Sequence, residues 1–576
     1  MLPSTKLTRE SLMLAARDYS YAVRLPGDHG ILVTSPALAR RLLEAGSAGG
    51  VERDVAMYER YSGFLDGSLV LLPQSKGSHR ALRAALLPLF SPTATRRLHA
   101  TLVECAQRLV ERLEAKAIPA PTSDADRSEI ARRTPPAPVY RLLQQFVLDV
   151  TMRCFLATPA DIIDADAKRL IALFEEWLSN PPPPPGQPPP SERQPWLARI
   201  AARMPWAPTS AASAINGKGS DGGGGQDSDE EDQDGADRLR LLFDAILGRL
   251  CRRQADTAAE AMALEAAAVE EAEENPSSYR RASSCALDAS EPTPSVVPQV
   301  GIGRERMRKV SVVPLGPPPL PSVHSALADA GITDPEVVRA QTAGLLFAGL
   351  NSAKELSYAA TLLANHPQLQ ADARAEVDAV LADQPPSYSQ LTPPMRSSTV
   401  TDNEARIMLA SARQRAELDE QPAPIESSAS LELCARIVNE TLRLSPGIEH
   451  LRLLTTRETT VPLESGSTST NGGAESLTIP KDVRLVISIS TLHRHPRHWA
   501  QPCDTPRPEL FSPAAQATRS SGSFLPFSAG AKGCPAAMFA LHEMRLMIAM
   551  LLQRFELLPA RGGGVCVARR PSSTSS

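Results

Sequence analysis

The sequence has no long apolar run and no excess of one charge. No stretch approaches the roughly 20 apolar residues that a membrane helix needs, and residues 1–6 do not begin a signal peptide. The net charge of −4 arises from 61 basic and 65 acidic residues, a balance that gives no reason to expect nucleic-acid binding. We therefore expect a protein that is soluble or peripheral to a membrane and that binds no nucleic acid.

Paired cysteines are also missing. The 8 cysteines lie far apart, with no C-x-x-C pair and no clustered zinc spacing. This pattern excludes a disulfide framework and a structural zinc site as the basis of the fold. A reducing compartment fits best.

The length and the proline content indicate one large domain interrupted by insertions. The chain has 576 residues and 52 prolines, and its polar tracts cannot bury enough apolar surface to offset chain entropy. We predict a mainly α domain with small β-sheets over residues 1–560. Disordered or flexible insertions are predicted at residues 181–236, 275–321 and 385–430, and a disordered tail at residues 561–576.

One cysteine stands between a glycine-bent loop and an apolar helix. Gly530 and Gly533 allow backbone angles that other residues resist, and Pro535 suits the first position of a helix over residues 537–555. Cys534 then lies at the helix N-terminus, where orphan N–H groups and the helix dipole favour a thiolate. Such a thiolate can ligate a soft or borderline metal, but a buried cysteine that caps a core helix has the same pattern.

A long apolar helix is predicted at residues 333–366, ending before Pro367. Its middle, residues 343–350, is apolar all round, which is typical of a helix that crosses the centre of a domain. Gly349 costs about 1 kcal/mol there relative to alanine, so either a ligand or another helix approaches it closely. Residues 139–155 also have a helical pattern.

Two polar pairs have helical spacing. His79 and Arg83 are four apart in a predicted helix over residues 77–90, and Glu440 and Arg443 are three apart in another helix. Taken alone, the first pair is typical of a solvated helix face. The second, if exposed, contributes only a few tenths of a kcal/mol.

The cysteine loop resembles a known family. Phe527, Gly530, Lys532 and Cys534 have the spacing of the haem-ligating loop in the cytochrome P-450 family of haem-thiolate monooxygenases. The family usually has Arg or His where this chain has Lys532. The resemblance implies a helical domain that encloses a buried haem b, whose iron takes the thiolate of Cys534 as axial ligand.

The resemblance assigns roles to other residues. It implies that His79, Arg83, Arg452 and Lys532 bind the haem propionates. These positions carry the positive or hydrogen-bonding side chains that two carboxylates require.

The resemblance also implies a buried structural ion pair between Glu440 and Arg443. In the family an Arg of the meander segment completes this network. The meander is resembled by residues 492–513, but Ala515 occupies the position of that Arg. We expect Arg519 or another nearby base to substitute, or else a weakened structure on this side of the haem.

The family's central helix carries a small-Gly-x-acid-Thr pattern above the haem. This chain matches it as Ala348, Gly349, Asn351 and Ser352, and the two polar positions depart. The family uses its acid–alcohol pair to deliver protons. Because an amide cannot release a proton near neutral pH, we expect a working but slower oxygenase.

By resemblance, the expected reaction inserts one oxygen atom from O2 into a hydrophobic small molecule. The electrons would come from an NADPH-dependent reductase, and the protein would be a monomer at the endoplasmic reticulum membrane surface. Asn351 and Ser352 favour one alternative, a haem-thiolate isomerase or peroxygenase that acts on hydroperoxides. Ala515 and the insertions favour another, a non-catalytic haem-binding protein.

Overall fold

The computed structural model describes residues 22–25, 30–54, 65–156, 248, 322–392, 429–462 and 476–570. The insertions predicted at residues 181–236 and 275–321, and most of the one at 385–430, lie outside these ranges. The described part is mainly helical with small sheets, which confirms the predicted fold class.

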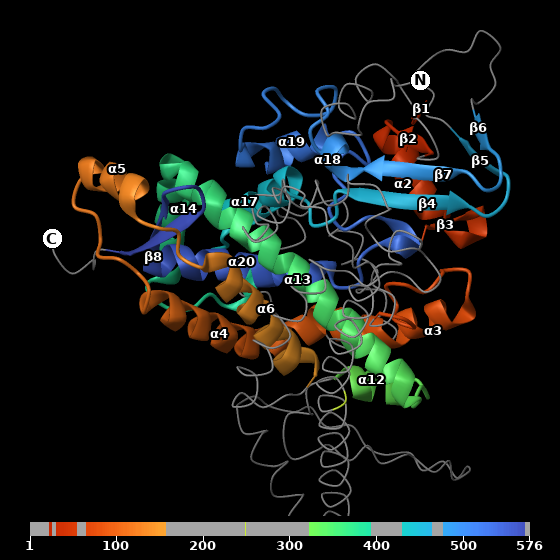
Figure 1. The fold of residues 1–576 in the computed structure, drawn as a ribbon, viewed down its shortest axis with the longest axis horizontal. Coiled ribbons are helices and arrows are strands. Elements are labelled where there is room, and N and C mark those ends of the chain that lie inside the picture. The colour runs from red at the N-terminus through yellow and green to blue at the C-terminus, as the bar shows by residue number, and fades with distance from the viewer. Residues whose placement is uncertain are drawn as a thin grey trace, which may run out of the picture.

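Helices form the larger part of the molecule, with a five-stranded sheet beside them (Figure 1). The helices are α2 (Pro36–Ala45), α3 (Gly77–Leu86), α4 (Pro92–Glu114), α5 (Asp124–Arg133), α6 (Val139–Phe155), α12 (Val323–Asp329), α13 (Pro335–Asn365), α14 (Pro367–Leu381), α15 (Tyr388–Leu391), α17 (Glu432–Leu444), α18 (Ile489–Leu492), α19 (Pro513–Ala517) and α20 (Ala537–Arg554). Short 3-10 turns include η4 (Leu87–Phe90), η6 (Pro508–Phe511) and η7 (Gly530–Lys532).

Helix α13 crosses the helical part and packs on α6 and α20 (Figure 1). Its N-cap is Asp334, whose side chain accepts a hydrogen bond from the Glu336 N–H at 2.9 Å. A carboxylate at this position accepts a hydrogen bond from an otherwise unpaired backbone N–H and interacts favourably with the positive end of the helix dipole. The helix therefore begins two residues later than predicted.

The structure explains Gly349 by helix packing. A Cβ at this position would lie 2.9 Å from Thr151 Oγ1 and 3.3 Å from Val147 Cγ1, both on α6. Only glycine lets the two helices approach this closely without a shift. Of the two explanations left open by the sequence, close approach of another helix is the one that the contacts support.

The main sheet has the strand order β1-β2-β7-β4-β3. The strands are β1 (Ala22–Arg24), β2 (Ile31–Val33), β3 (Val51–Arg53), β4 (His450–Thr455) and β7 (Arg484–Ser488). β2 and β7 are parallel, and the other pairs are antiparallel. Helix α2 covers one face of this sheet through an apolar cluster. A separate hairpin joins β5 (Thr459–Pro462) to β6 (Ser476–Ile479).

The prediction of a disordered tail at residues 561–576 is wrong for most of that segment. Strand β8 (Phe555–Pro559) pairs antiparallel with β9 (Val565–Arg569) across a glycine turn. Both faces of β9 are buried, with Val565 and Val567 in the main core and Cys566 against a smaller cluster. This alternation is a strand pattern that the sequence analysis missed. Residues 571–576 lie outside the described ranges.

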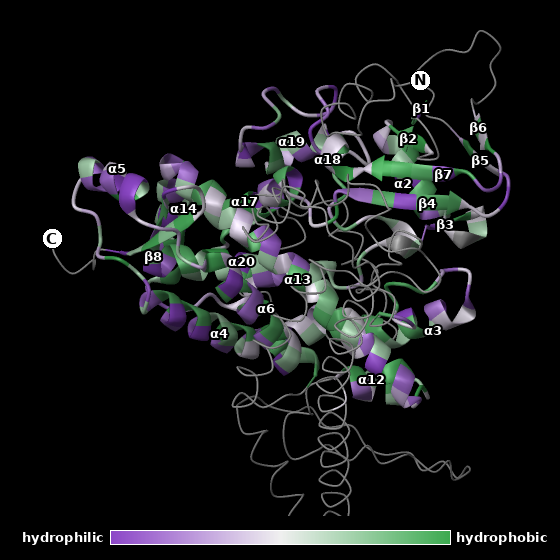
Figure 2. Cartoon of the chain, viewed as in Figure 1, coloured by the Kyte–Doolittle hydropathy of each residue, from purple (hydrophilic) through white to green (hydrophobic). Residues whose placement is uncertain are grey.

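Hydropathy follows burial (Figure 2). α5 is largely hydrophilic and buries none of its residues, whereas α20 is buried along nearly its whole length. Within the described ranges, no helix combines the length and the apolar character needed to cross a membrane.

Candidate functional site

The cysteine loop is folded tightly against α2. Gly530 has φ +61°, and a Cβ on it would lie 2.8 Å from Glu44 Cα and from the Leu43 carbonyl oxygen. The positive φ and the close approach both require glycine here. The Cys534 N–H donates to the Phe527 carbonyl at 2.9 Å, which closes the loop. The loop therefore holds the Cys534 side chain at a fixed, half-buried position.

Burial raises the pKa of the Cys534 thiol. The Ala536 N–H, which donates to the sulfur, and the charges of Arg83 and Arg53 act in the opposite direction. Desolvation of the sulfur thus outweighs the thiolate-favouring effect that we predicted for a helix N-terminus. α20 begins only at Ala537, three residues after the cysteine. A cation bound directly to the sulfur would reverse this balance, since coordination deprotonates a thiol.

Arg83 and Arg53 act on this thiol through their charges, and both also act on His79. His79 and Arg83 lie on α3, and Arg53 ends β3. Burial lowers the pKa of His79, and the charges of Arg83 and Arg53 lower it further. Burial also lowers the pKa of Arg83, while the nearby Cys534 raises it. Among the residues that the structure describes, no carboxylate forms an ion pair with Arg83 or Arg53.

The sequence analysis missed Arg53. Its guanidinium donates to the Val70 carbonyl at 3.0 Å, and its charge acts on Cys534 and His79. No motif marks this residue, because β3 is only three residues long. Only the folded chain brings it next to α3.

The structure places Arg452 on the other face of the sheet. Arg53 pairs with Leu453 in the antiparallel ladder, and residues directly opposite each other share a face. The side chain of Arg452, one residue earlier, therefore points to the opposite face from Arg53. The predicted binding of a haem propionate by Arg452 stays a prediction, and this register places Arg452 and Arg53 on different faces. Lys532 ends η7, two residues before Cys534, and its binding of a propionate stays a prediction.

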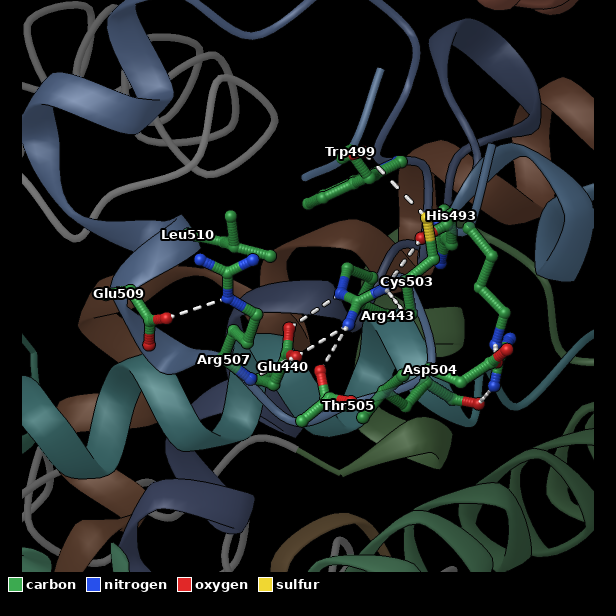
Figure 3. Close-up of polar contacts among 12 residues, drawn as sticks. Glu440, Arg443, His493, Trp499, Cys503, Asp504, Thr505, Arg507, Glu509 and Leu510 are labelled. Atoms are coloured by element: carbon green, nitrogen blue, oxygen red, sulfur yellow. Dashed lines mark hydrogen bonds and ion pairs between the residues drawn. The ribbon is translucent and has the colours of Figure 1, made fainter. Parts of the chain in front are cut away.

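The Glu440–Arg443 pair is fully buried, with 0% exposure of both side chains. Arg443 Nε and Nη2 each donate to Glu440 at 2.7 Å, a bidentate arrangement (Figure 3). Arg443 Nη1 donates to the carbonyls of His493 at 3.0 Å and Cys503 at 2.7 Å. This pair therefore joins α17 to the segment that follows α18, and it is not an exposed surface pair.

The base that we expected as the third member of this network, beside Glu440 and Arg443, does not contact Glu440. Instead, the Arg507 backbone N–H donates to Glu440 Oε1 at 2.7 Å, and the Arg507 side chain turns to Glu509 (Figure 3). Ala515 lies in α19, where its N–H donates to the N-cap Ser512 at 3.4 Å. A backbone donor thus occupies the place that we expected a base to fill.

Arg519 does not substitute for the missing base. Its guanidinium carbon lies 4.8 Å from the Trp499 ring centroid and 4.5 Å from that of Phe511. Stacking on aromatic faces stabilises a cation and buries its apolar stem. Arg519 therefore belongs to an aromatic cluster beside the ion pair.

The central helix presents its polar residues in different directions. Asn351 is exposed, and its Nδ2 donates to the Ala348 carbonyl, also of an exposed residue, at 3.1 Å. Ser352 is buried and hydrogen-bonds to Glu543 of α20. Neighbouring helix positions diverge by about 100°. The structure therefore does not bring Asn351 and Ser352 together as the predicted acid–alcohol replacement.

The residues present fit a haem. The half-buried thiol can supply an axial ligand, and the cations without a carboxylate partner can neutralise two propionates. On α13 Ala348 and Asn351 are exposed, and so is the apolar side chain of Ile448 before β4. This donor set is of the kind that a haem-thiolate protein requires.

Comparison with known proteins shows what part of the chain resembles. The family model described as Cytochrome P450 matches residues 408–573. Cytochrome P450 4A10 of Rattus norvegicus is 30% identical over 226 residues, which cover 38% of this chain and 34% of that protein. Cytochrome P450 3A13 of Mus musculus is 28% identical over 239 residues, covering 41% and 36%. Probable cytochrome P450 4p3 of Drosophila melanogaster is 34% identical over 122 residues, 21% of each chain.

Residues 408–573 are therefore similar to the cytochrome P450 family, and the relatives matched over part of the chain are cytochromes P450. The aligned part spans about a third of the length of the first of these relatives, 34%. The family-model match at residues 408–573 includes the ion pair, the meander and the cysteine loop.

Proposed function

We propose that this protein is a monooxygenase that inserts one oxygen atom from O2 into a hydrophobic small molecule. The observation that carries the proposal is the half-buried Cys534, held by a glycine-bent loop within range of the charges of Arg83 and Arg53. A thiolate bound to haem iron supplies the electron density that favours O–O cleavage.

In this proposal each side chain has a defined task. Cys534 binds the iron, and Arg83, Arg53 and His79 hold the propionates. Their charges also favour the thiolate, since Arg83 and Arg53 both lower the pKa of Cys534. Lys532 is the fourth propionate partner that we predict.

The substrate side of the site is defined by α13 and the segment that enters β4. Ala348 and Ile448 offer apolar surface, and Asn351 offers the exposed amide. An apolar site with few polar groups favours a hydrophobic ligand. Two electrons per turnover would come from an NADPH-dependent flavoprotein reductase.

The test is spectroscopic. The reduced, carbon-monoxide-bound protein should show the red-shifted Soret band of thiolate ligation. Cys534→Ser should lose this band, and Cys566→Ser, a buried cysteine of β9, should keep it. An unchanged band in Cys534→Ser would overturn the proposal.

One observation favours a second function. Ser352 turns to Glu543, so the exposed face of α13 offers an amide at Asn351 but no acid–alcohol pair. A haem-thiolate isomerase or peroxygenase acting on hydroperoxides needs no such pair and no reductase. Rapid hydroperoxide turnover without reductase, and no reductase-dependent O2 uptake, would establish this alternative.

We also propose that the protein is a monomer that associates with the endoplasmic reticulum membrane, as the family resemblance implies. Fractionation of cell membranes and gel filtration of the purified protein test both points. Recovery of the protein in the fraction without membranes would contradict the proposed membrane association.

A further inference from the structure

A buried acid lies on the same face of α13 as the exposed amide. Glu355 is four residues after Asn351 and seven after Ala348, which places the three on one stripe of the helix. Glu355 is only 5% exposed, although the two residues before it on the stripe are exposed. The stripe therefore leads from an open surface to a buried carboxyl group.

Gly447 holds this carboxyl group in place. The Gly447 N–H donates to Glu355. A Cβ at residue 447 would overlap Glu355 Oε1 and would lie 3.5 Å from Asn351 Cβ. Both side chains thus lie against the same glycine. The absence of a side chain at Gly447 is what allows the carboxyl group to approach the Asn351 side of the helix.

The charges around Glu355 do not compensate a carboxylate. On its own helix, Lys354 favours ionisation, but this lysine lies 4.0 Å from Glu449 of the segment entering β4. On α20, Glu543 faces Glu355 and is itself buried. From the cysteine loop, Cys534 also lies within range of the Glu355 charge.

Burial raises the pKa of Glu355 to about 8, against the smaller opposing effects of Lys354 and the Gly447 N–H. A buried acid with this pKa is protonated at neutral pH and can act as a general acid near its working pH. Burial likewise raises the pKa of Glu543 to about 8, while the hydrogen bond from Ser352 lowers it. Glu543, however, is hydrogen-bonded to Ser352, whereas Glu355 lies with Asn351 against Gly447.

We propose that Glu355 is the proton-supplying residue of this site and acts through water held by the exposed amide of Asn351. This inference rests on the proposed oxygenase function. In the step, the O–H bond of the Glu355 carboxylic acid breaks and its proton passes to that water. The carboxylate left behind accepts the Gly447 N–H and regains a proton from solvent. The protons are consumed as the reductase's electrons reduce O2 in the site.

Glu355 is a positioning residue in this scheme, because it acts through Asn351 and its water. It supplies what Asn351 lacks, since an amide can orient water but cannot release a proton near neutral pH. The site thus keeps a proton source on the central helix, one turn after Asn351.

The test uses the haem-loaded full chain and two matched variants, Glu355→Gln and Glu543→Gln. Infrared difference spectroscopy across a pH titration reports the C=O band of a protonated carboxylic acid. We expect a band that titrates near pH 8 and disappears in Glu355→Gln. A band from Glu543 should remain in that variant.

A second readout is the amount of hydrogen peroxide released per O2 consumed with an NADPH-dependent flavoprotein reductase. We expect Glu355→Gln to raise this ratio by about tenfold, since loss of a general acid has effects of this size or larger. Glu543→Gln should leave the ratio within about twofold of the starting protein. Asn351→Leu should raise the ratio while it keeps the Glu355 band, because it removes only the water that the acid acts through.

Two results would overturn the inference: no titrating band assigned to Glu355, or equal peroxide ratios in the two glutamine variants. Either result leaves the proposed function intact if the Soret band of thiolate ligation is present. Conversely, loss of that band in the starting protein would defeat the proposed function itself. The infrared titration does not depend on turnover.

Discussion

Two buried glutamates, Glu440 and Glu355, differ in what surrounds them. Glu440 is fully buried and bound by both arms of Arg443 and by the Arg507 N–H. Glu355 is 5% exposed and has one backbone donor, with its neighbouring lysine 4.0 Å from another carboxylate. A buried carboxylate stays ionised only when it is paired and hydrogen-bonded. The first glutamate is therefore a structural anion, and the second is a neutral acid with a proton to give.

The positions of the two residues agree with this division. Glu440 joins α17 to the chain segments around Cys503 and Arg507, which precede the cysteine loop. Glu355 lies on the helix whose exposed stripe borders the proposed substrate space. Structural support thus uses a charged carboxylate that is paired, whereas proton supply uses an unpaired carboxyl group that stays neutral.

Removing the partner of Glu440 should have the largest effect. Arg443→Ala leaves Glu440 buried with only the Arg507 N–H, and breaking a buried pair in this way costs about 3–5 kcal/mol. We expect a fall of this size in the free energy of unfolding, measured by urea denaturation, or failure to recover folded protein.

The control lies on the same helix. Arg436 pairs with Glu432 at 2.9 Å, with side chains 25% and 40% exposed. Arg436→Ala should cost less than about 1 kcal/mol, as is usual for exposed pairs. Similar losses in the two variants would show that the Glu440–Arg443 pair has no special structural role.

Several parts of this arrangement could be predicted from the sequence. The helix over residues 139–155 has the predicted bounds, and the central helix differs by two residues at its start and one at its end. Local periodicity and capping signals determine these elements. The cysteine at the end of a glycine loop and the Glu440–Arg443 spacing are also local patterns.

The remainder depends on contacts between distant parts of the chain. The face on which Arg53 or Arg452 lies is set by the register between β3 and β4, and a shift of one residue reverses it. The direction of Ser352 is set by Glu543 on α20. No local motif carries this information, which is why Arg53 and the face on which Arg452 lies could not be predicted from the sequence.

The neutral glutamate should make the protein less stable at alkaline pH. Glu355 has a raised pKa of about 8, against 4.5 in the unfolded chain. Between these values the folded state binds more protons than the unfolded state, so stability falls as pH rises. We expect urea denaturation to show a loss of about 2–4 kcal/mol from pH 5 to pH 8 for a shift of this size.

Glu355→Gln should remove the part of the alkaline loss that comes from Glu355, because an amide resembles the protonated acid and never ionises. The loss that comes from Glu543, whose pKa is also raised to about 8, should remain. Glu440→Gln should not have the same effect, since Glu440 is an ionised partner of Arg443. If Glu355→Gln has the same pH dependence as the starting protein, Glu355 is not neutral in the folded state.

The region of the ion pair should instead weaken at acid pH. His493, whose carbonyl accepts from Arg443, is buried and uses Nδ1 to donate to the Leu442 carbonyl at 3.2 Å. Its Nε2 accepts the Leu525 N–H at 2.9 Å. Burial is the main cause that lowers the pKa of His493 to about 3, from an ordinary 6.5.

Between these two pKa values the unfolded state binds the extra proton, so stability falls as pH decreases from 6.5 towards 3. We expect a loss of about 1–3 kcal/mol from this group between pH 6.5 and pH 4.5. His493→Gln should be less stable at pH 7 but should lose less on acidification. An equal acid-induced loss in the variant would assign the effect to other groups.

The smallest expected effect concerns the packing that positions the Glu355 stripe. Gly349→Ala places a Cβ 2.9 Å from Thr151 Oγ1 and 3.3 Å from Val147 Cγ1. Overpacking of this kind costs about 1–3 kcal/mol, and the gain in helix propensity returns about 1 kcal/mol. A net loss of about 1 kcal/mol in urea denaturation is expected, and Thr151→Ala in the same chain should restore part of it by removing the clashing hydroxyl.

Because α13 would shift relative to α6 without any change at Glu355 itself, the titration midpoint of the Glu355 band should move only slightly. A variant of unchanged stability with an altered haem spectrum would instead show that Gly349 is required for the approach of a ligand, and that the contact with α6 is incidental.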